Sequence, residues 1–214
     1  MEDSFKHKGM RKKLIEELRY FGITEERVLD AMMKIPRHFF LDLAFVEQAY
    51  SNVAFQIGVG QTISHPRTVA YQTQLLNPQR GQKILEIGTG SGYQTSVLCE
   101  MGARVYSMER QKELFIKSRK IISQLGYTPK LFFGDGYKGM PSYAPYDGII
   151  VTCGAPFIPE ALVEQLKPGG KMIIPVGEGA KQIMHQVTKN PDGTLQVDQF
   201  GEFSFVPMLE KVAK

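Results

Sequence analysis

A carboxylate followed by three closely spaced glycines is the part of this chain best suited to holding a cofactor. Residues 84–92 read Ile-Leu-Glu-Ile-Gly-Thr-Gly-Ser-Gly, an apolar run that contains Glu86 and continues into glycine at every second position. Such a run predicts a buried strand that passes through a glycine turn into a helix, the arrangement of a nucleotide-cofactor site. A dinucleotide fingerprint would require glycine at position 93, where the chain has Tyr93. We therefore do not expect a pyrophosphate at the start of this helix.

Acidic residues stand at the ends of three successive predicted strands. Glu86 ends the first, Glu109 follows the second, and Asp135 follows the third within Gly134-Asp135-Gly136. Ligands of an open α/β sheet bind outside the carboxyl ends of its strands, and an acid about 20 residues beyond the glycine turn suits ribose hydroxyls. Singly, each acid has an ordinary structural explanation as a helix cap, a surface charge or a turn residue. Together, beside the glycine turn, they indicate a bound nucleoside.

An acid-rich nucleoside site without a phosphate cradle suits a cationic ligand. S-adenosylmethionine is a sulfonium with a ribose and an adenine but no phosphate, and a nearby carboxylate lowers the cost of desolvating its charge. The segment resembles the class I methyltransferase motif, and Leu166-Lys167-Pro168-Gly169-Gly170 resembles the turn before that superfamily's fifth strand. The resemblance implies cofactor contacts from Glu86, Gly88, Thr89, Gly90, Ser91, Gly92, Glu109, Asp135 and Gly136.

The elements that must position these residues alternate regularly from residue 83 onward. The sequence predicts strands at 83–87, 104–108, 130–133, 147–152 and 171–176, separated by helices at 91–101, 111–125 and 159–166. Short apolar runs that alternate with helices indicate right-handed βαβ units and a parallel sheet covered on both faces. We therefore expect a Rossmann-like α/β fold of the class I methyltransferase type.

Two flanking regions extend this predicted core. An N-terminal helical extension covers 9–35, with a break at Gly22 and a second helix that has Thr24 as its N-cap. Residues 36–65 have no regular pattern, and a helix follows over 66–76; so long a loop is usually functional. C-terminal strands at 181–188, 194–200 and 203–212, with a turn at Pro191-Asp192-Gly193, predict antiparallel edge strands. We expect a single domain over 1–214, divided into N-terminal helices and lid (1–80), cofactor-binding core (81–177) and C-terminal strands (178–214).

Bulk composition excludes several classes of protein. The chain has 214 residues and a net charge of +4, a smaller excess than nucleic-acid binders usually concentrate on one face. Cys99 and Cys153 show no metal-ligand spacing and predict buried thiols in a reducing compartment. The scattered His38, His65 and His185 do not suggest a metal site either. No leader or membrane-spanning run is visible, so we expect a cytoplasmic monomer that binds neither membrane nor nucleic acid.

The identity of the substrate rests on other motifs. Ile35-Pro36-Arg37-His38-Phe39-Phe40, Gly58-Val59-Gly60-Gln61-Thr62-Ile63-Ser64-His65-Pro66, Gly134-Asp135-Gly136 and Phe205-Val206-Pro207-Met208 resemble those of the protein-L-isoaspartate O-methyltransferase family. The resemblance covers about residue 28 to residue 210. It implies methyl transfer from S-adenosylmethionine to the free α-carboxylate of L-isoaspartyl and D-aspartyl residues in damaged proteins. The ester then closes to a succinimide, which hydrolyses partly to normal aspartate.

The same resemblance assigns roles to individual residues. Ser64 matches the family's active-site serine, Gln61, Thr62 and Ile63 match the loop over the methyl-transfer centre, and Val206 lies in the segment that lines the substrate cleft. The chain departs from the family at the rim of the peptide site. These departures are Asn52, Phe55-Gln56 and Ser204.

The expected reaction needs positioning rather than a strong base. An α-carboxylate has a pKa near roughly 3.5 and is already an ionised nucleophile at neutral pH. We expect the loop Gly58–Ser64 to act as a lid that excludes water, and the Ser64 hydroxyl to donate a hydrogen bond to the reacting carboxylate. The competing interpretation is that Ser64 caps the helix that begins near Pro66.

Three other functions remain open on the sequence. The first is a methyltransferase of the same fold that acts on RNA or a small molecule, although Val151–Pro156 lacks the N-P-P-Y-type tetrapeptide of base amino-group methylation. The second is a non-catalytic cofactor-binding module, which predicts a defective lid or a missing strand-end acid. The third is an NAD-dependent dehydrogenase, which the glycine spacing disfavours.

Overall fold

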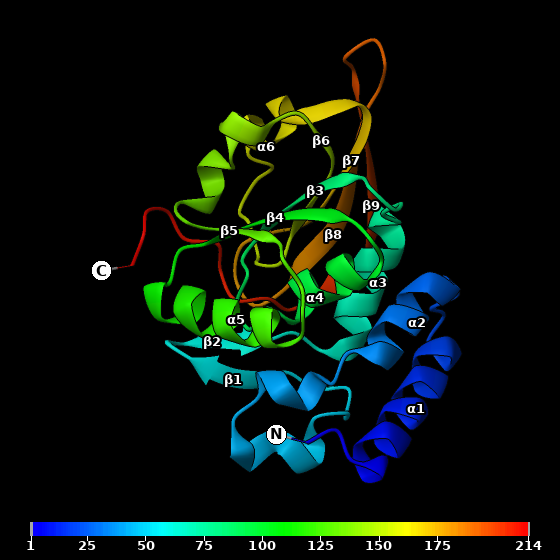
Figure 1. The fold of residues 1–214 in the computed structure, drawn as a ribbon. Coiled ribbons are helices and arrows are strands. Elements are labelled where there is room, and N and C mark those ends of the chain that lie inside the picture. The colour runs from blue at the N-terminus through cyan, green and yellow to red at the C-terminus, as the bar shows by residue number, and fades with distance from the viewer. Residues whose placement is uncertain (1, 214) are drawn as a thin grey trace.

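A seven-stranded, mostly parallel sheet forms the centre of the computed structural model, which describes residues 2–213 (Figure 1). The spatial order of its strands is β5-β4-β3-β6-β7-β8-β9. Strands β3 to β7 are parallel, and β8 and β9 add an antiparallel hairpin at one edge. The expected Rossmann-like sheet with antiparallel edge strands is confirmed. The strands are β3 (Lys83–Ile87), β4 (Arg104–Glu109), β5 (Lys130–Phe133), β6 (Tyr146–Val151), β7 (Leu166–Val176), β8 (Gln182–Lys189) and β9 (Leu195–Phe203).

The C-terminal strands differ from the sequence expectation at two places. Strand β7 begins at Leu166 rather than at residue 171, because Leu166 already pairs with Tyr146 and the Pro-Gly-Gly turn forms an irregularity within the strand. The predicted strand at 203–212 is wrong. The chain leaves the sheet after β9 and makes only an isolated bridge at Pro207, which has no backbone N–H to continue a ladder.

Helices cover both faces of the sheet, as predicted. Helices α3 (Pro66–Leu76), α4 (Tyr93–Glu100) and α5 (Lys112–Gln124) lie on one face, and the short α6 (Glu160–Glu164) lies on the other (Figure 1). Successive β3 side chains point to opposite faces. Ile84 therefore packs with residues of α3 and α4, whereas Leu85 packs with Leu162 of α6. No helix within residues 2–213 is long and apolar enough to cross a bilayer.

Two N-terminal helices pack beside this core. Helix α1 (Phe5–Tyr20) starts four residues earlier than predicted, with Ser4 as its N-cap. Helix α2 (Glu26–Lys34) has Glu25 as its N-cap and not Thr24, as the sequence suggested. The cause is tertiary: Gln74 of α3 accepts hydrogen bonds from the backbone N–H groups of Thr24 and Glu25, at 2.7 and 2.9 Å.

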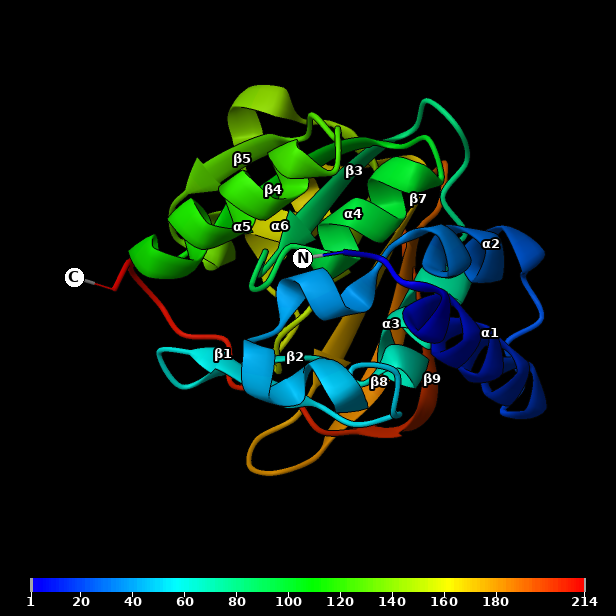
Figure 2. The same cartoon turned by 60° about the horizontal axis from the view of Figure 1, so that its bottom comes forward.

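The segment 36–65 is more regular than the sequence indicated. It contains two 3-10 turns, η1 (Arg37–Phe40) and η2 (Leu43–Gln48), and a small hairpin of β1 (Phe55–Gly58) and β2 (Gln61–Ile63). The hairpin turn is Val59-Gly60, and both residues have positive φ, 46° and 68°. Figure 2 shows this hairpin apart from the main sheet, close to the C-terminal segment. The expected lid is therefore the turn and second strand of a hairpin.

One apolar core joins the N-terminal region to the cofactor half of the molecule. Leu14 and Leu18 of α1 belong to the same buried cluster as Tyr93 and Val97 of α4. Ile57 and Ile63 of the hairpin also belong to it. The lid is thus anchored in the core that supports the helix after the glycine turn.

Candidate active site

A cleft of about 800 Å³, partly open to solvent, lies at the carboxyl ends of β3 and β4. Strands β4 and β5 lie on one side of β3, and β6 and β7 lie on the other, so the direction in which strands are added changes here. Ligands of open α/β sheets usually bind at such a point. Of the residues predicted for the site, eleven line the cleft and three do not. The lining members are Gln61, Thr62, Ile63, Ser64, Gly88, Thr89, Gly90, Ser91, Glu109, Gly136 and Val206.

The glycine turn forms one wall, and its glycines have different tasks. Gly88 has φ 96°, and a Cβ there would lie 2.6 Å from Thr152 Oγ1. Gly90 has φ 53° and faces the cleft. Gly92 has φ 88° and does not line the cleft, and its Cβ would lie 2.8 Å from Ile122 Cδ1 of α5, so this glycine allows α5 to pack closely against the turn. The structure thus separates Gly92 from the predicted cofactor contacts.

Glu109 stands at the wall of the cleft and ties β4 to the glycine turn. Its Oε2 accepts from the backbone N–H of Gly90 at 2.7 Å, and its Oε1 accepts from that of Gln111 at 2.8 Å. Burial raises the pKa of Glu109, opposed by these backbone donors. The carboxylate is therefore held in one orientation beside the position expected for the ribose.

Glu86 lies behind the glycine turn and does not reach the cleft. It is fully buried, and its Oε2 accepts from Thr95 Oγ1 at 2.5 Å and from Ser107 Oγ at 2.6 Å. Ser107 also hydrogen-bonds to Thr89 at 2.6 Å. Burial raises the pKa of Glu86 to about 8, against the effect of the two hydroxyl donors. Glu86 is thus mainly protonated at neutral pH and supports the turn from below instead of presenting a charge to a ligand.

Asp135 holds the C-terminal segment and does not line the cleft. Its Oδ1 accepts from the N–H of Tyr137 at 3.0 Å, and its Oδ2 accepts from the N–H of Lys211 at 3.1 Å. Residues 206–209 line the cleft directly, and Met208 N–H donates to Gly154 O at 2.7 Å. The segment that leaves the sheet after β9 therefore becomes a wall of the site.

Ser64 lines the cleft opposite the glycine turn. The N-cap of α3 is His65, and that cap makes no side-chain hydrogen bond. No group within residues 2–213 hydrogen-bonds to the Ser64 hydroxyl, so it does not serve as the cap that the competing interpretation required. Its carbonyl, by contrast, accepts from Arg37 Nη2 at 2.8 Å. The hydroxyl is thus unengaged while its backbone is fixed.

Arg37, Tyr93 and Cys153 are among the residues near the site that sequence reasoning missed or assigned elsewhere. Tyr93 was expected to pack, and it does so while also lining the cleft. Cys153 lines the cleft, and burial raises the pKa of its thiol to about 12, so it is protonated at neutral pH. Arg37 supports the lid from behind. In the sequence it was marked by its place within the motif Ile35–Phe40, but no role was assigned to it there.

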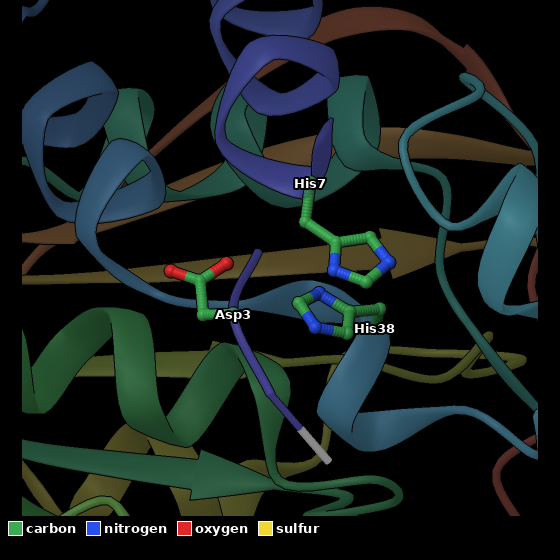
Figure 3. Close-up of side chains that lie close together, drawn as sticks. All are labelled: Asp3, His7 and His38. Atoms are coloured by element: carbon green, nitrogen blue, oxygen red, sulfur yellow. The ribbon is translucent and has the colours of Figure 1, made fainter. Parts of the chain in front are cut away.

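A cluster of Asp3, His7 and His38 brings three potential metal ligands within 4.8 Å of one another (Figure 3). Each already has protein partners: Arg11 donates to both oxygens of Asp3, and His38 bonds Tyr50 at 2.7 Å through Nδ1 and the Glu2 carbonyl at 3.3 Å through Nε2. The His7 and His38 rings are stacked at 3.9 Å. Imidazoles ligate in the plane of the ring, so stacked rings do not direct lone pairs to one point. The geometry favours a structural role for this cluster.

Comparison with known proteins gives a consistent family. The profile of the protein-L-isoaspartate(D-aspartate) O-methyltransferase family matches residues 9–213. The protein-L-isoaspartate O-methyltransferase of Flavobacterium psychrophilum is 56% identical over 98% of this chain and 99% of its own length. That of Christiangramia forsetii is 52% identical over the same shares.

Solved structures that superpose on this chain include members of the same family. A protein-L-isoaspartate O-methyltransferase superposes with a TM-score of 0.83 at 28% identity, over 92% of this chain and 65% of the other. A putative Plasmodium falciparum member, in complex with S-adenosyl-L-homocysteine, superposes with a TM-score of 0.81 at 27% identity, over 95% of this chain and 98% of the other.

Proposed function

The chain belongs to the protein-L-isoaspartate O-methyltransferase family, and from this we infer that it transfers a methyl group from S-adenosylmethionine to the free α-carboxylate of isoaspartyl residues in damaged proteins. D-aspartyl residues are the second substrate that the family description names. The ester formed leads to repair through a succinimide. An RNA or small-molecule methyltransferase is not favoured by any relative described above.

The residues of the cleft fit S-adenosylmethionine. Gly88 lines the cleft and has no room for a side chain against Thr152, and the acid Glu109 stands on the wall. Arg110 is the one lysine or arginine among the described residues that line the cleft, so the cleft is not strongly basic. We assign cofactor binding to Gly88, Thr89, Gly90, Ser91, Glu109 and Gly136, with Glu86, Gly92 and Asp135 supporting them from behind. When bound, the cofactor supplies the electrophilic methyl group of its sulfonium.

The observation that carries the proposal is that one cleft contains both halves of the reaction. The glycine turn and Glu109 form one side, and Ser64 with the lid and Val206 form the other. An isoaspartyl carboxylate is ionised at neutral pH and needs no base. The protonated Cys153 and the hydrogen-bonded Glu109 fit that requirement, since neither is a free base.

Ser64 orients the substrate. Its hydroxyl has no partner among the described residues, so it can donate a hydrogen bond to the reacting carboxylate without giving up a bond of its own. Gln61, Thr62 and Ile63 cover the centre, and the exclusion of water favours a step in which a carboxylate and a cation neutralise each other.

A paired peptide assay tests this function. An isoaspartyl peptide and its normal aspartyl counterpart are offered with radiolabelled S-adenosylmethionine, and base-labile methyl ester is counted. We expect label on the isoaspartyl peptide alone. Equal labelling of both peptides, or of neither, would contradict the assignment.

We also propose that the chain acts as a single domain and a monomer in the cytoplasm, without nucleic acid as a substrate. The core shared by α1 and α4 supports one domain over the described residues; positions 1 and 214 lie outside them. Both cysteines are free thiols, which suits a reducing compartment. Size-exclusion chromatography with light scattering tests the monomer, since a mass near twice 24.1 kDa would contradict it.

A further inference from the structure

Arg37 is a fully buried arginine without an acidic partner within residues 2–213. Its exposed fraction is 0%, and all its hydrogen bonds go to backbone carbonyls. Its Nη1 has no partner at all. A buried charge without a counter-ion is costly, and an apolar side chain of similar volume would fill the same space more cheaply. Packing alone therefore does not explain an arginine at this position.

The three carbonyls relate Arg37 to the lid. Nε donates to Ala49 at 3.0 Å, and Nη2 donates to Val53 at 3.4 Å and to Ser64 at 2.8 Å. Ala49 and Val53 precede the β1–β2 hairpin, whereas Ser64 follows it. One guanidinium thus fixes both ends of the chain segment that carries the lid. A lysine would not reproduce this contact, because its single ammonium lacks the planar fork.

The other side of the guanidinium faces the cofactor half. Its Cζ lies 5.0 Å from the ring centroid of Tyr93, the first residue of α4. Tyr93 and Ser64 both line the cleft, but Arg37 does not. The positive charge therefore sits directly behind the wall, between the lid and the helix that follows the glycine turn.

The side chain stays charged in this position. Burial lowers the pKa of Arg37 to about 10, against the influence of Tyr93 and Tyr50, so it is a cation at neutral pH. Burial, with the Arg37 charge, also lowers the pKa of His65. The Arg37 charge is therefore felt at the residue that follows Ser64.

We propose that Arg37 is a positioning residue for methyl transfer, which fixes the Ser64 backbone against α4 and places a positive charge behind the region that receives the substrate carboxylate. The inference rests on the proposed function. Fixing the backbone of Ser64 limits the directions in which its hydroxyl can point, and alignment of reacting groups contributes strongly to rate. A fixed cation in a low-dielectric region favours an anionic substrate.

Arg11 provides a matched control. It is also a buried arginine, 4% exposed, and it lies 5.8 Å from the ring centroid of Tyr50. Its hydrogen bonds go to Asp3 and the Tyr50 hydroxyl and none goes to the lid, and it does not line the cleft. Removing Arg11 therefore tests the loss of a buried arginine without the loss of lid positioning.

The experiment compares Arg37→Met, Arg37→Lys and Arg11→Met. For Arg37→Met we expect kcat/KM on an isoaspartyl peptide to fall roughly 50-fold, with S-adenosylhomocysteine affinity within about threefold of wild type. For Arg37→Lys, which keeps the charge but not the fork, we expect KM within about threefold and kcat lowered roughly tenfold. Arg11→Met should lower the melting temperature and leave kcat/KM of the folded enzyme within about threefold.

Hydrogen exchange of the lid gives a readout that does not depend on activity. In Arg37→Met the amides of residues 61–64 should exchange at least about tenfold faster, whereas Arg11→Met should leave them unchanged. If the wild-type protein does not methylate the isoaspartyl peptide, the proposed function is wrong. The exchange data would still test whether the hydrogen bonds of Arg37 hold the lid.

Three outcomes would overturn the inference. One is a folded Arg37→Met variant with wild-type kcat/KM, and another is an equal activity loss in Arg37→Met and Arg11→Met. If Arg37→Met does not fold, the Arg37→Lys variant is used in its place. The third outcome that would overturn the inference is an Arg37→Lys variant with wild-type kcat and unchanged hydrogen exchange in the lid.

Discussion

The two walls of the cleft are built in different ways. The cofactor wall is centred on residues adjacent in the sequence, 87–91, to which Glu109 and Gly136 add from the ends of neighbouring strands, and Glu86 supports it from within the parallel sheet. The substrate wall is assembled from residues 61–64 and 206–209, which are more than 140 residues apart in the sequence. Backbone pairing holds both parts, within the β1–β2 hairpin and between residues 206–208 and Gly154, and single side chains add to it: Arg37 at Ser64, and Asp135 at Lys211.

The difference separates two kinds of constraint. On the cofactor wall, backbone conformation and close packing leave little freedom, so changes there should affect binding of the cofactor most. On the substrate wall, orientation depends on a few long-range hydrogen bonds, so changes there should affect turnover while the cofactor still binds. Four substitutions test this contrast.

Gly88→Ala should have the largest effect. The added Cβ would meet Thr152 Oγ1 at 2.6 Å, and φ of 96° is unfavourable for alanine. We expect S-adenosylhomocysteine affinity to fall roughly 1,000-fold, or about 4 kcal/mol, by calorimetry. Gly60→Ala on the lid is the control, because it also has positive φ (68°) but open space around it. Similar losses in the two variants would mean that strain, and not the close approach, governs the cofactor wall.

Ser64→Ala should affect turnover alone. Loss of a hydrogen bond to a charged group costs about 1.5–3 kcal/mol, so we expect kcat/KM on the isoaspartyl peptide to fall roughly 10- to 150-fold. Affinity for S-adenosylhomocysteine should stay within about twofold, because the hydrogen bonds that hold the glycine turn go to Ser107 and Glu109 and not to Ser64. Unchanged activity in Ser64→Ala would contradict the role assigned to Ser64. A loss of S-adenosylhomocysteine affinity as large as the loss of activity would contradict the difference between the two walls.

Glu86→Gln should change how stability depends on pH. The folded-state pKa of about 8 lies above the ordinary value of 4.5, so the folded protein binds the extra proton and wild-type stability falls as pH rises between these values. Between pH 6 and 8 we expect a loss of about 2 kcal/mol in wild type that Glu86→Gln lacks. Urea denaturation at the two pH values measures it. If the free energy of unfolding depends on pH in the same way in both proteins, Glu86 is ionised in the folded protein and the expectation is wrong.

Val59→Asn should have the smallest effect and the opposite sign. Val59 is β-branched and has φ of 46° at the hairpin tip, with an exposed fraction of 42%. Asparagine tolerates this left-handed conformation, and Asn-Gly is the preferred pair for such a turn. We expect the free energy of unfolding to rise by about 1 kcal/mol, with kcat within about twofold. A loss of stability, or a large loss of kcat, would show that the valine side chain itself serves the lid.

The parallel core could be predicted because its signals are local. Strand β3 was predicted over its full range, and β5 and α3 likewise, because short apolar runs and turn residues mark their ends. Two boundaries that failed, one of a helix and one of a strand, depended on distant partners. Gln74 of α3 occupies the backbone donors near Thr24, and the chain after Phe203 leaves the sheet to line the cleft.

The sequence by itself determined the cofactor turn, the succession of strands and helices along the core, and the motif that contains Ser64. Glycine conformation and hydrophobic periodicity are properties of neighbouring residues, and so they can be read locally. Only the tertiary structure decided that Glu86 and Asp135 support the site from behind, and that Arg37 holds both ends of the lid. Burial and the choice of hydrogen-bond partner depend on residues far along the chain, which no local pattern encodes.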